Sequence, residues 1–488
     1  MKPKHLAALG FDKSSPAFPL LQRLAGQALA RGESEEALRA VLTRLAKEPE
    51  AFADNSHWSA AARLHMEALA ARANYVEHDS PVRYVRYGDG IEAGAIQQME
   101  NACRLPITRA AALMPDAHQG YGLPIGGVLA VENAVIPYAV GMDIACRMKL
   151  TVLDMPPQVL SNPAEAERLR NALERETRFG VGASFRKRHD HAVMDADWTV
   201  SPVTRRWKDR AWAQLGTSGS GNHFVEFGEL TLESPARLWT RADGAGAPGK
   251  TNGDLPAGTY LALLSHSGSR GTGGEVAQHY SRLAMRQRPE LPKELQTLAW
   301  FALDSAEGRE YWAAMELMGR YAAANHELIH RMILKNLGAA AIGDVENHHN
   351  FAWRETHVID GTPREVVVHR KGATPAAAGA LGVIPGSMAA PGFVVRGRGT
   401  AESLNSASHG AGRAMSRTKA NETFTRAGLT ALLEERGVRL LSAGLDECPL
   451  AYKDIHAVMA AQKDLVDVLA VFMPRLVKMA PAGERAED

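Results

Sequence analysis

Cysteine is nearly absent from this chain of 488 residues, which contains only Cys103, Cys146 and Cys448. An odd and sparse set argues against a disulfide framework and fits a reducing compartment, where a thiol is free to bind metal. The sequence also lacks any stretch of about 18 uncharged apolar residues that could span a bilayer. The first residues have no apolar core of the signal-peptide type. We therefore expect a soluble, cytoplasmic protein.

An excess of one charge is lacking too, because 56 basic side chains are balanced by 55 acidic ones and the net charge is only +1. No global positive field results, so any contact with nucleic acid must depend on local clusters of charge. Hydrophobic residues make up 45% of the chain and charged residues 23%, which is typical of a globular protein. At this length we expect one large body with an appendage.

The first 79 residues contain none of the chemical motifs described below, and their pattern is helical. Leu38, Val41, Leu42 and Leu45 recur at helical spacing, and an alanine-rich run covers residues 60–73. We expect an N-terminal helical extension over residues 1–79. It could dock on the body, recruit a partner or simply pack.

From about residue 80 the sequence changes to short β-branched runs separated by glycine clusters. Helical stretches are expected near residues 293–337 and 451–472. There are no evenly spaced βαβ units and there is no fixed repeat, so an α+β fold is predicted for residues 80–488 rather than a Rossmann fold or a barrel.

Two insert-like stretches carry charge and little pattern, at residues 184–212 and 229–258. The first is rich in arginine. It could contact phosphates or form a solvated loop.

Five separated residues form a candidate ligand set for two metal ions: Asp143, Cys146, His223, His266 and His349. A site that mixes a thiolate, a carboxylate and imidazoles suits manganese, zinc, iron or cobalt, and disfavours magnesium and calcium, which prefer oxygen ligands. Each motif alone is weak evidence, because a buried cysteine or a satisfied polar histidine is the commoner case. The recurrence of histidine in glycine-rich or polar strings favours the metal interpretation.

Several of these strings are suited to phosphate. Glycine runs at residues 216–221 and 266–271 let backbone N–H groups approach an anion, and Arg270 adds a guanidinium. A further glycine-rich turn, MPDAHQGYGLPIGGV, contains Asp116 and His118. Together the strings predict a site for metal and polyphosphate assembled from many loops.

His409 lies among small residues in SASHGAGRAMSR, ahead of Arg413 and Arg417. A neutral imidazole can attack phosphorus directly, and the small neighbours leave room for in-line approach. The arginines can offset charge on the phosphoryl oxygens. In isolation, a histidine that closes a glycine turn would be the simpler interpretation.

The ordered strings MPDAHQGYG, GMDIAC, GSGNHFVE, HSGSRG, HHN, HRKGAT, IPGSM and SHGAGR resemble the RtcB-type RNA-splicing ligase family over about residues 80–471. The resemblance implies an α+β body with a central sheet assembly. It also implies a ligase, dependent on GTP and manganese, that joins RNA ends bearing a 3′-phosphate or 2′,3′-cyclic phosphate to 5′-hydroxyl ends.

The resemblance further implies how the ligands are shared between two Mn²⁺ ions. Cys146 would bridge the ions, His266 and His349 would complete one of them, and Asp143 and His223 would complete the other. A bridging cysteine must be a thiolate, which metal binding enforces.

The resemblance also implies roles in nucleotide chemistry. His409 would attack the α-phosphorus of GTP, GMP would pass to the RNA 3′-phosphate, and the 5′-hydroxyl would then displace it. Water would first open a cyclic phosphate, and Asp116 would stand near the RNA ends. The implied GTP pocket comprises Asn222, His223, Phe224, Val225, Glu226, His349, Asn350, Pro385, Gly386, Ser387, Met388, His409, Gly410, Ala411 and Gly412.

Some positions depart from the family pattern. Arg147 and Ala389 stand where glycine is usual, and Gly392 stands where serine is common. We expect these changes to affect the shape of the pocket and its affinity for GTP rather than the metal ligands. Near the C-terminus the family commonly has a lysine that contacts the nucleotide, and Lys478 is out of register with it.

Other functions would use the same residues. A two-metal phosphohydrolase acting on nucleotides or RNA ends would need no nucleophile in SHGAGR, and a non-catalytic RNA-binding component would need no chemistry at all. A lysine-based nucleotidyl ligase is a third alternative, because KTNG at residues 250–253 faintly resembles the KxDG motif of that class.

Overall fold

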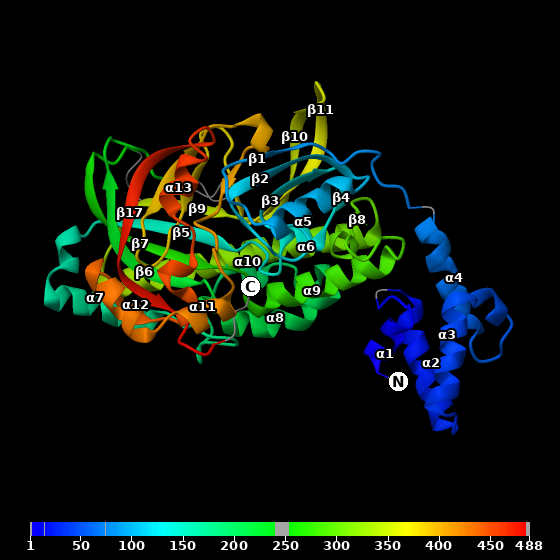
Figure 1. Ribbon diagram of the computed structural model, residues 1–488. Coiled ribbons are helices and arrows are strands. Elements are labelled where there is room, and N and C mark those ends of the chain that lie inside the picture. The colour runs from blue at the N-terminus through cyan, green and yellow to red at the C-terminus, as the bar shows by residue number, and fades with distance from the viewer. Residues whose placement is uncertain (1, 14, 74, 240–252, 485–488) are drawn as a thin grey trace.

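The computed structural model describes residues 2–13, 15–73, 75–239 and 253–484, and it has the predicted α+β fold (Figure 1). Of the KTNG string, Lys250, Thr251 and Asn252 lie outside the described residues.

Helices are distributed along the whole described chain. They are α1 (Pro3–Ala8), α2 (Ala17–Ala30), α3 (Glu35–Lys47), α4 (Ser59–Ala73), α5 (Ala93–Arg104), α6 (Pro137–Val140), α7 (Pro163–Glu176), α8 (Pro202–Gln214), α9 (Arg270–Gln287), α10 (Ala306–Leu337), α11 (Arg417–Thr423), α12 (Arg426–Glu435) and α13 (Ile455–Ala460). Even α10, with 32 residues, has no apolar run long enough to cross a membrane, and the same holds for every other described helix.

Among the residues that the structure describes, strands occur only from Tyr84 onward, in the body of the molecule. They are β1 (Tyr84–Arg86), β2 (Thr108–His118), β3 (Ile125–Val131), β4 (Ala134–Val135), β5 (Arg147–Leu153), β6 (Phe224–Leu232), β7 (Gly258–Ser267), β8 (Phe301–Ala302), β9 (Ala341–His348), β10 (Asn350–Ile359), β11 (Thr362–Lys371), β12 (Ala373–Pro375), β13 (Leu381–Ile384), β14 (Gly392–Gly397), β15 (Ser406–Ser408), β16 (Arg439–Ser442) and β17 (Val466–Met479).

Two large sheets and the two-stranded pairs β12-β15 and β4-β8 form the described part of the body. The larger has the order β13-β14-β17-β6-β7-β5-β9, with β16 added beside β17, and the smaller has the order β1-β2-β3-β11-β10. Pairing is antiparallel except between β1 and β2 and between β16 and β17. A shared apolar core joins the sheets, because Met114 and Val128 of the smaller one pack in the same cluster as Ile384 and Val395 of the larger one.

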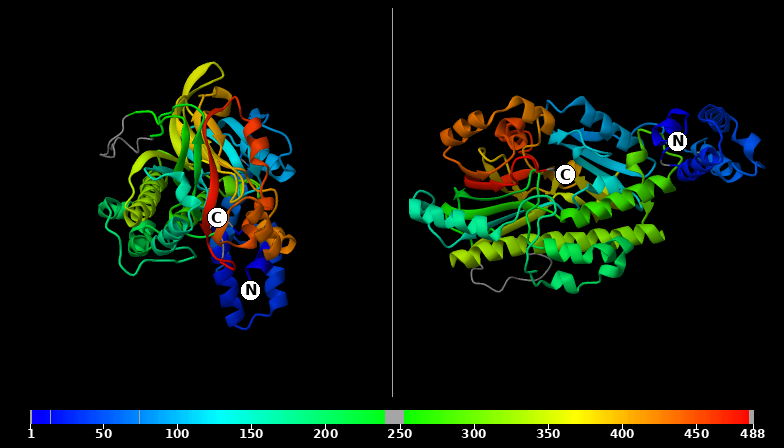
Figure 2. Two further views of the ribbon diagram at one scale, coloured as in Figure 1. Left: turned by 90° about the vertical axis from the view of Figure 1, so that its left-hand side faces the viewer. Right: turned by 90° about the horizontal axis from the view of Figure 1, so that it is seen from below.

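Helices α8, α9 and α10 lie together along one side of the body, as the view from below shows (Figure 2). Helix α10 is capped at its start by Ser305, whose hydroxyl accepts a hydrogen bond from the N–H of Gly308, and at its end by Gly338 in the left-handed conformation. Its residues Ile329 and Ile333 pack with Phe227 and Leu263 on one face of the larger sheet. Helix α10 thus supports the strands that carry the candidate site.

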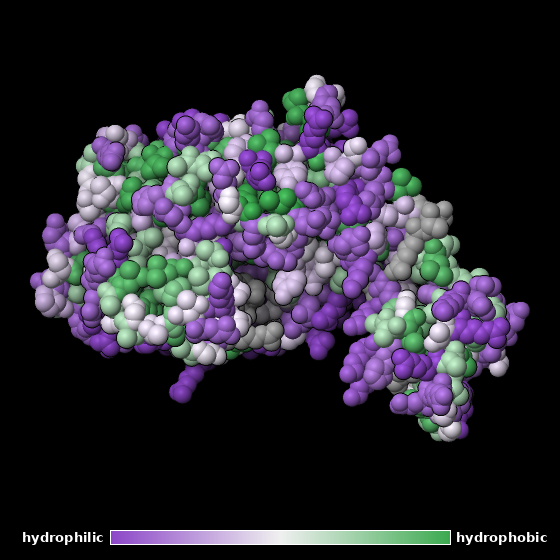
Figure 3. Space-filling view, viewed as in Figure 1, coloured by the Kyte–Doolittle hydropathy of each residue, from purple (hydrophilic) through white to green (hydrophobic). Residues whose placement is uncertain are grey.

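The N-terminal helices α1 to α4 lie beside the body (Figure 1), where the space-filling view shows a separate lobe (Figure 3). They bury a core of their own, which includes Leu21, Leu38, Leu42 and Trp58. The side chain of Gln296 in the body donates a hydrogen bond to Asp12 of the lobe. The helices expected near residues 38–45 and 60–73 are therefore confirmed.

The helical prediction for residues 451–472 was wrong in its second half. Helix α13 ends at Ala460, and β17 begins at Val466. The spacing of apolar residues from Leu465 to Phe472 is compatible with either structure. Pairing with β14 and β6, which are distant in sequence, decides for a strand. In the arginine-rich stretch 184–212, the second half belongs to helix α8, which was not predicted.

Candidate metal and nucleotide site

Strand register brings four of the five predicted ligands to one end of the larger sheet. Cys146 immediately precedes β5 and His223 immediately precedes β6, whereas His266 and His349 lie at the ends of β7 and β9. Because these strands run antiparallel, their starts and ends alternate along the sheet edge. Arg147 pairs with Ser267 and His348, and Phe224 pairs with His266. Residues separated by up to 203 positions in sequence, 349 minus 146, thereby become neighbours.

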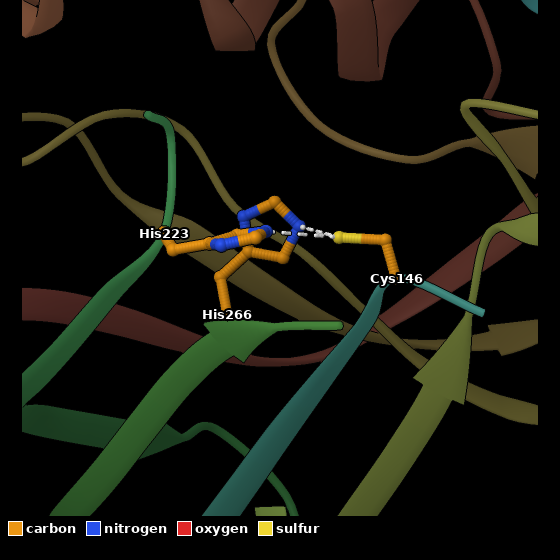
Figure 4. Close-up of side chains that lie close together, drawn as sticks. All are labelled: Cys146, His223 and His266. Atoms are coloured by element: carbon orange, nitrogen blue, oxygen red, sulfur yellow. Dashed lines mark hydrogen bonds between the residues drawn. The ribbon is translucent and has the colours of Figure 1, made fainter. Parts of the chain in front are cut away.

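The side chains of these residues converge on one locus. Cys146 Sγ lies 3.1 Å from His266 Nε2 and 3.4 Å from His223 Nε2 (Figure 4). His266 Nε2 lies 3.2 Å from His349 Nε2, and Asp143 Oδ2 lies 3.1 Å from His223 Nε2. All five predicted ligands therefore belong to one buried, continuous cluster.

The ionisation of this cluster suits a cation. Burial lowers the pKa of His266 and His349 well below the usual range, so both rings are neutral and offer lone pairs. Burial alone would raise the pKa of Asp143, but the hydrogen bond and charge of His223 and the charge of Arg270 lower it, so the carboxylate is ionised. One carboxylate, one thiol and three imidazoles with converging donor atoms fit borderline divalent ions.

The loop after β7 holds the Asp143 carboxylate. Asp143 Oδ1 accepts hydrogen bonds from the backbone N–H of Ser269 at 2.9 Å and from its hydroxyl at 3.3 Å. Gly268 packs so closely on this carboxylate that a Cβ at that position would overlap it. Gly268, the first glycine in HSGSRG, is thus required for the close approach of this loop to Asp143.

His409 lies beside this cluster, and its orientation is fixed by Asp116. The Asp116 carboxylate accepts hydrogen bonds from Nδ1 of His409 at 2.6 Å and from its backbone N–H at 3.1 Å. Burial would raise the pKa of Asp116, but the charge and hydrogen bond of His409 lower it. The ring centroids of His409 and His349 are 5.0 Å apart. Because Nδ1–H of His409 donates a hydrogen bond to the Asp116 carboxylate, Nε2 keeps its lone pair and can act as a nucleophile.

A pocket adjoins His409 and the candidate metal ligands. Most of the predicted nucleotide residues line it, namely Asn222, Phe224, Glu226, Pro385, Gly386, Ser387, Met388, His409, Gly410, Ala411 and Gly412. His266 also lines it. Burial raises the pKa of Glu226 well above its usual value.

Other predicted nucleotide residues lie outside the pocket wall. Val225 points to the opposite face of β6, into the core with Phe227. Asn350 bridges two loops, since its Nδ2 donates to Asp143 O at 3.2 Å and its Oδ1 accepts from the N–H of Gly372 at 2.8 Å. His223 and His349 belong to the metal cluster next to the pocket.

The departures from the family pattern fall in different places. Arg147 points away from the pocket and forms an ion pair with Glu346 under α10. Gly392 lines the pocket, and a Cβ there would meet Pro385 no closer than 3.4 Å. Lys478 faces away from the pocket, which Val477 and Met479 line, and its Nζ lies 3.3 Å from Leu173 O.

Sequence reasoning missed part of the pocket. Tyr452 and Glu447 line it together with Arg413 and Arg417, and the Tyr452 hydroxyl and Arg417 both hydrogen-bond Glu447. These two residues lie in a stretch without glycine-histidine strings, so no local signal marks them.

A second missed feature is a buried polar network beneath the ligands. Glu346 pairs with both Arg147 and Lys149, and Lys149 Nζ lies 2.7 Å from Asp344. From Asp344 the network continues through hydrogen bonds of 2.7 to 3.0 Å that join Thr151, His330, Ser265 and His326. The network connects β9, β5 and β7, which lead to His349, Cys146 and His266, and it fixes their spacing. The available signal was the presence of Asn325, His326 and His330 among the mostly apolar buried positions of α10.

Known proteins resemble most of this chain. The model of the RtcB family, described as tRNA-splicing ligase RtcB, matches residues 98–479. The chain is 33% identical over 425 residues to the RNA-splicing ligase RtcB1 of Escherichia coli, covering 80% of this chain and 95% of that protein. It is 31% identical over 464 residues to the tRNA-splicing ligase RtcB of Methanococcus maripaludis, covering 81% and 92%. It is 30% identical over 436 residues to the tRNA-splicing ligase RtcB of Thermococcus kodakarensis, covering 75% and 86%.

Proposed function

The chain belongs to the RtcB family, as its motif order predicted, and from that premise we propose that it seals RNA ends with GTP and two manganese ions. The 3′-phosphate or 2′,3′-cyclic phosphate of one RNA strand is joined to the 5′-hydroxyl of another through a GMP adduct on His409. The observation that supports this most is the placement of His409 against both the metal cluster and the pocket.

In this proposal the cluster of Asp143, Cys146, His223, His266 and His349 holds the manganese ions. Bound cations neutralise triphosphate charge and stabilise the departing pyrophosphate. The neutral rings of His266 and His349 and the ionised Asp143 support this assignment. The cysteine supplies one soft ligand among the harder ones.

The pocket next to His409 binds GTP in this proposal. Glu226 offers a buried carboxyl, and the adjacent N–H groups of guanine would donate to it, which offsets the cost of burying its charge. The ring of Phe224 and the phenol of Tyr452 supply flat surfaces in the same wall. We assign specificity for guanine to Glu226.

His409 carries the covalent chemistry. Because Nδ1–H of His409 donates a hydrogen bond to Asp116, Nε2 presents its lone pair and attacks the α-phosphorus of GTP. The bond from phosphorus to the bridging oxygen breaks, and pyrophosphate leaves. Arg413 and Arg417, which also line the pocket, offset charge on the phosphoryl oxygens.

RNA is the partner in this proposal, and helix α8 supplies basic surface for it. Arg206 and Arg210 stack on Trp207 at 5.8 and 5.1 Å, and Arg210 lies next to Gly271 at the start of α9. Exposed arginine held on an aromatic ring is suited to RNA phosphates and bases. Residues 1–79 form an appended module in this proposal, and a cytoplasmic location stays a prediction.

The test is labelling of the protein with α-³²P-GTP and manganese. The intact protein acquires an acid-labile GMP label, and His409→Ala does not. His456→Ala, which removes an exposed histidine outside the pocket, is the matched control and is labelled like the intact protein.

Label retained on His409→Ala would remove that residue from its role. Release of phosphate from GTP or from RNA ends without any adduct would instead favour the two-metal phosphohydrolase. Binding of RNA with neither reaction would favour the non-catalytic alternative.

A further inference from the structure

The turn between β2 and β3 borders the pocket but has no role in the chemistry described so far. His118 lines the pocket together with His409. Three residues further on, Tyr121 is 73% exposed, which is unusual for a large aromatic side chain. A residue inside the pocket and an exposed ring outside it thus belong to one short turn.

The backbone of this turn is held firmly. Gln98 Nε2 donates to Gly120 O at 2.6 Å, and the N–H of Gly120 donates back to Gln98 Oε1 at 3.0 Å. Lys371 Nζ donates to Tyr121 O. Gly122 adopts φ +71° and packs against Thr297 O, where a Cβ would be too close. The turn therefore presents the Tyr121 ring on a fixed backbone.

His118 is oriented by the same residue that orients His409. Its Nδ1 lies 3.1 Å from the carbonyl oxygen of Asp116, which can only accept, so Nδ1 carries the proton and Nε2 has a lone pair. Burial lowers the pKa of His118 to about 4, so the ring is neutral. Asp116 thus uses its carboxylate for His409 and its carbonyl for His118.

We propose that Tyr121 and His118 form the subsite for the RNA strand that carries the 5′-hydroxyl, with Tyr121 stacking on its terminal base and His118 Nε2 accepting the hydroxyl proton. The inference rests on the proposed ligase function and extends it. A base stacked on this ring would bring the 5′ end beside the pocket, and the fixed backbone of the turn lowers the conformational entropy that is lost on binding.

In the sealing step the 5′-oxygen forms a bond to the phosphorus of the GMP-activated 3′ end, and the bond from that phosphorus to the GMP oxygen breaks. GMP leaves with the electron pair. The hydroxyl proton moves to His118 Nε2 and from there to solvent.

The experiment follows each stage in a single reaction: the GMP adduct on the full-length protein, the RNA–GMP intermediate and the sealed strand. With Tyr121→Ala, the KM for the 5′-hydroxyl strand rises about tenfold, because stacking on one base is lost. Tyr121→Phe restores it, since the ring remains. With His118→Gln, sealing at saturating strand slows about 100-fold and the RNA–GMP intermediate accumulates.

Val358→Ala at the exposed tip of the β10–β11 hairpin is the control, and it seals at the wild-type rate. An unchanged KM in Tyr121→Ala, or no rescue by Tyr121→Phe, overturns the stacking role. Undiminished sealing by His118→Gln overturns the role of His118. Absence of an adduct on the wild-type protein overturns the proposed function and the subsite with it, so the two failures are distinct.

Discussion

The carboxylate of Asp116 receives two hydrogen bonds from His409, one from Nδ1 at 2.6 Å and one from the backbone N–H at 3.1 Å. Asp116 is fully buried. The backbone contact fixes where His409 stands, and the ring contact fixes which nitrogen carries the proton. One carboxylate from the smaller sheet therefore sets both the position and the tautomer of a histidine reached from β15.

Replacement of the Asp116 carboxylate should test whether its effect on the tautomer of His409 matters apart from its effect on the position of that ring. Asp116→Asn keeps the size of the side chain, but its amide can donate to Nδ1 and so favours the wrong tautomer. We expect formation of the GMP adduct to slow by about 100-fold or more, measured by rapid-quench labelling. Asp360→Asn, on the exposed hairpin, serves as the control. A rate close to wild type in Asp116→Asn would contradict this role.

The close approach of Gly268 to Asp143 predicts an effect on metal affinity. A methyl group at Gly268 would displace the Asp143 carboxylate, and we expect affinity for Mn²⁺ to fall about 10- to 100-fold. Titration of the purified protein followed by the EPR signal of free Mn²⁺ would measure it. Gly274→Ala in α9 provides a matched change, since a Cβ there meets nothing within 4 Å. Equal affinities in the two variants would refute the prediction.

The buried ion pairs under α10 predict unequal effects of removing their members. Glu346 neutralises both Arg147 and Lys149, and burial of these charges is otherwise costly. Glu346→Ala should lower the free energy of unfolding by about 3–5 kcal/mol. Arg147→Ala should lower the free energy of unfolding by less, because Glu346 would still form an ion pair with Lys149. Urea unfolding of both variants tests this order, and a larger loss in Arg147→Ala would reverse it.

Lys371 predicts a dependence of stability on pH. Burial lowers its pKa from 10.5 to about 7. Between these values the unfolded chain holds a proton that the folded chain does not, so a rise in pH favours the folded state through this group. Wild type should therefore gain stability relative to Lys371→Met as pH rises from about 7 toward 10.5.

Urea midpoints at several pH values in this window would measure the difference. Lys463→Met removes an exposed lysine and should leave the pH dependence of wild type unchanged. Parallel curves for wild type and Lys371→Met would contradict the assignment.

The local spacing of apolar residues was sufficient to predict several helices but not every strand. The alanine-rich run ahead of residue 73 is a helix, and so is the predicted stretch 293–337 from Ala306 onward, where caps such as Ser305 and Gly338 mark the ends of α10. The helical prediction was wrong for residues 293–305, which contain strand β8 and no α-helix. Strand β17 was missed because its apolar spacing suits a helix as well, and its partners β14 and β6 are distant in sequence.

Much of the candidate site could also be predicted from local sequence motifs. Glycine next to histidine or aspartate marks positions where backbone must approach an anion or a ligand, and Gly268 against Asp143 is an instance. Tyr452, Glu447 and the polar residues of α10 carry no such local mark. Their roles come from packing between remote segments, which only the assembled sheets display.

The position of β17 has a consequence for folding. This strand lies between β14 and β6 in the interior of the larger sheet, and its residues Val477 and Met479 line the pocket. A chain that lacks β17 leaves the facing edges of β14 and β6 unpaired and loses part of the pocket wall. Removal of β17 should therefore give a product that is prone to aggregate through these open edges.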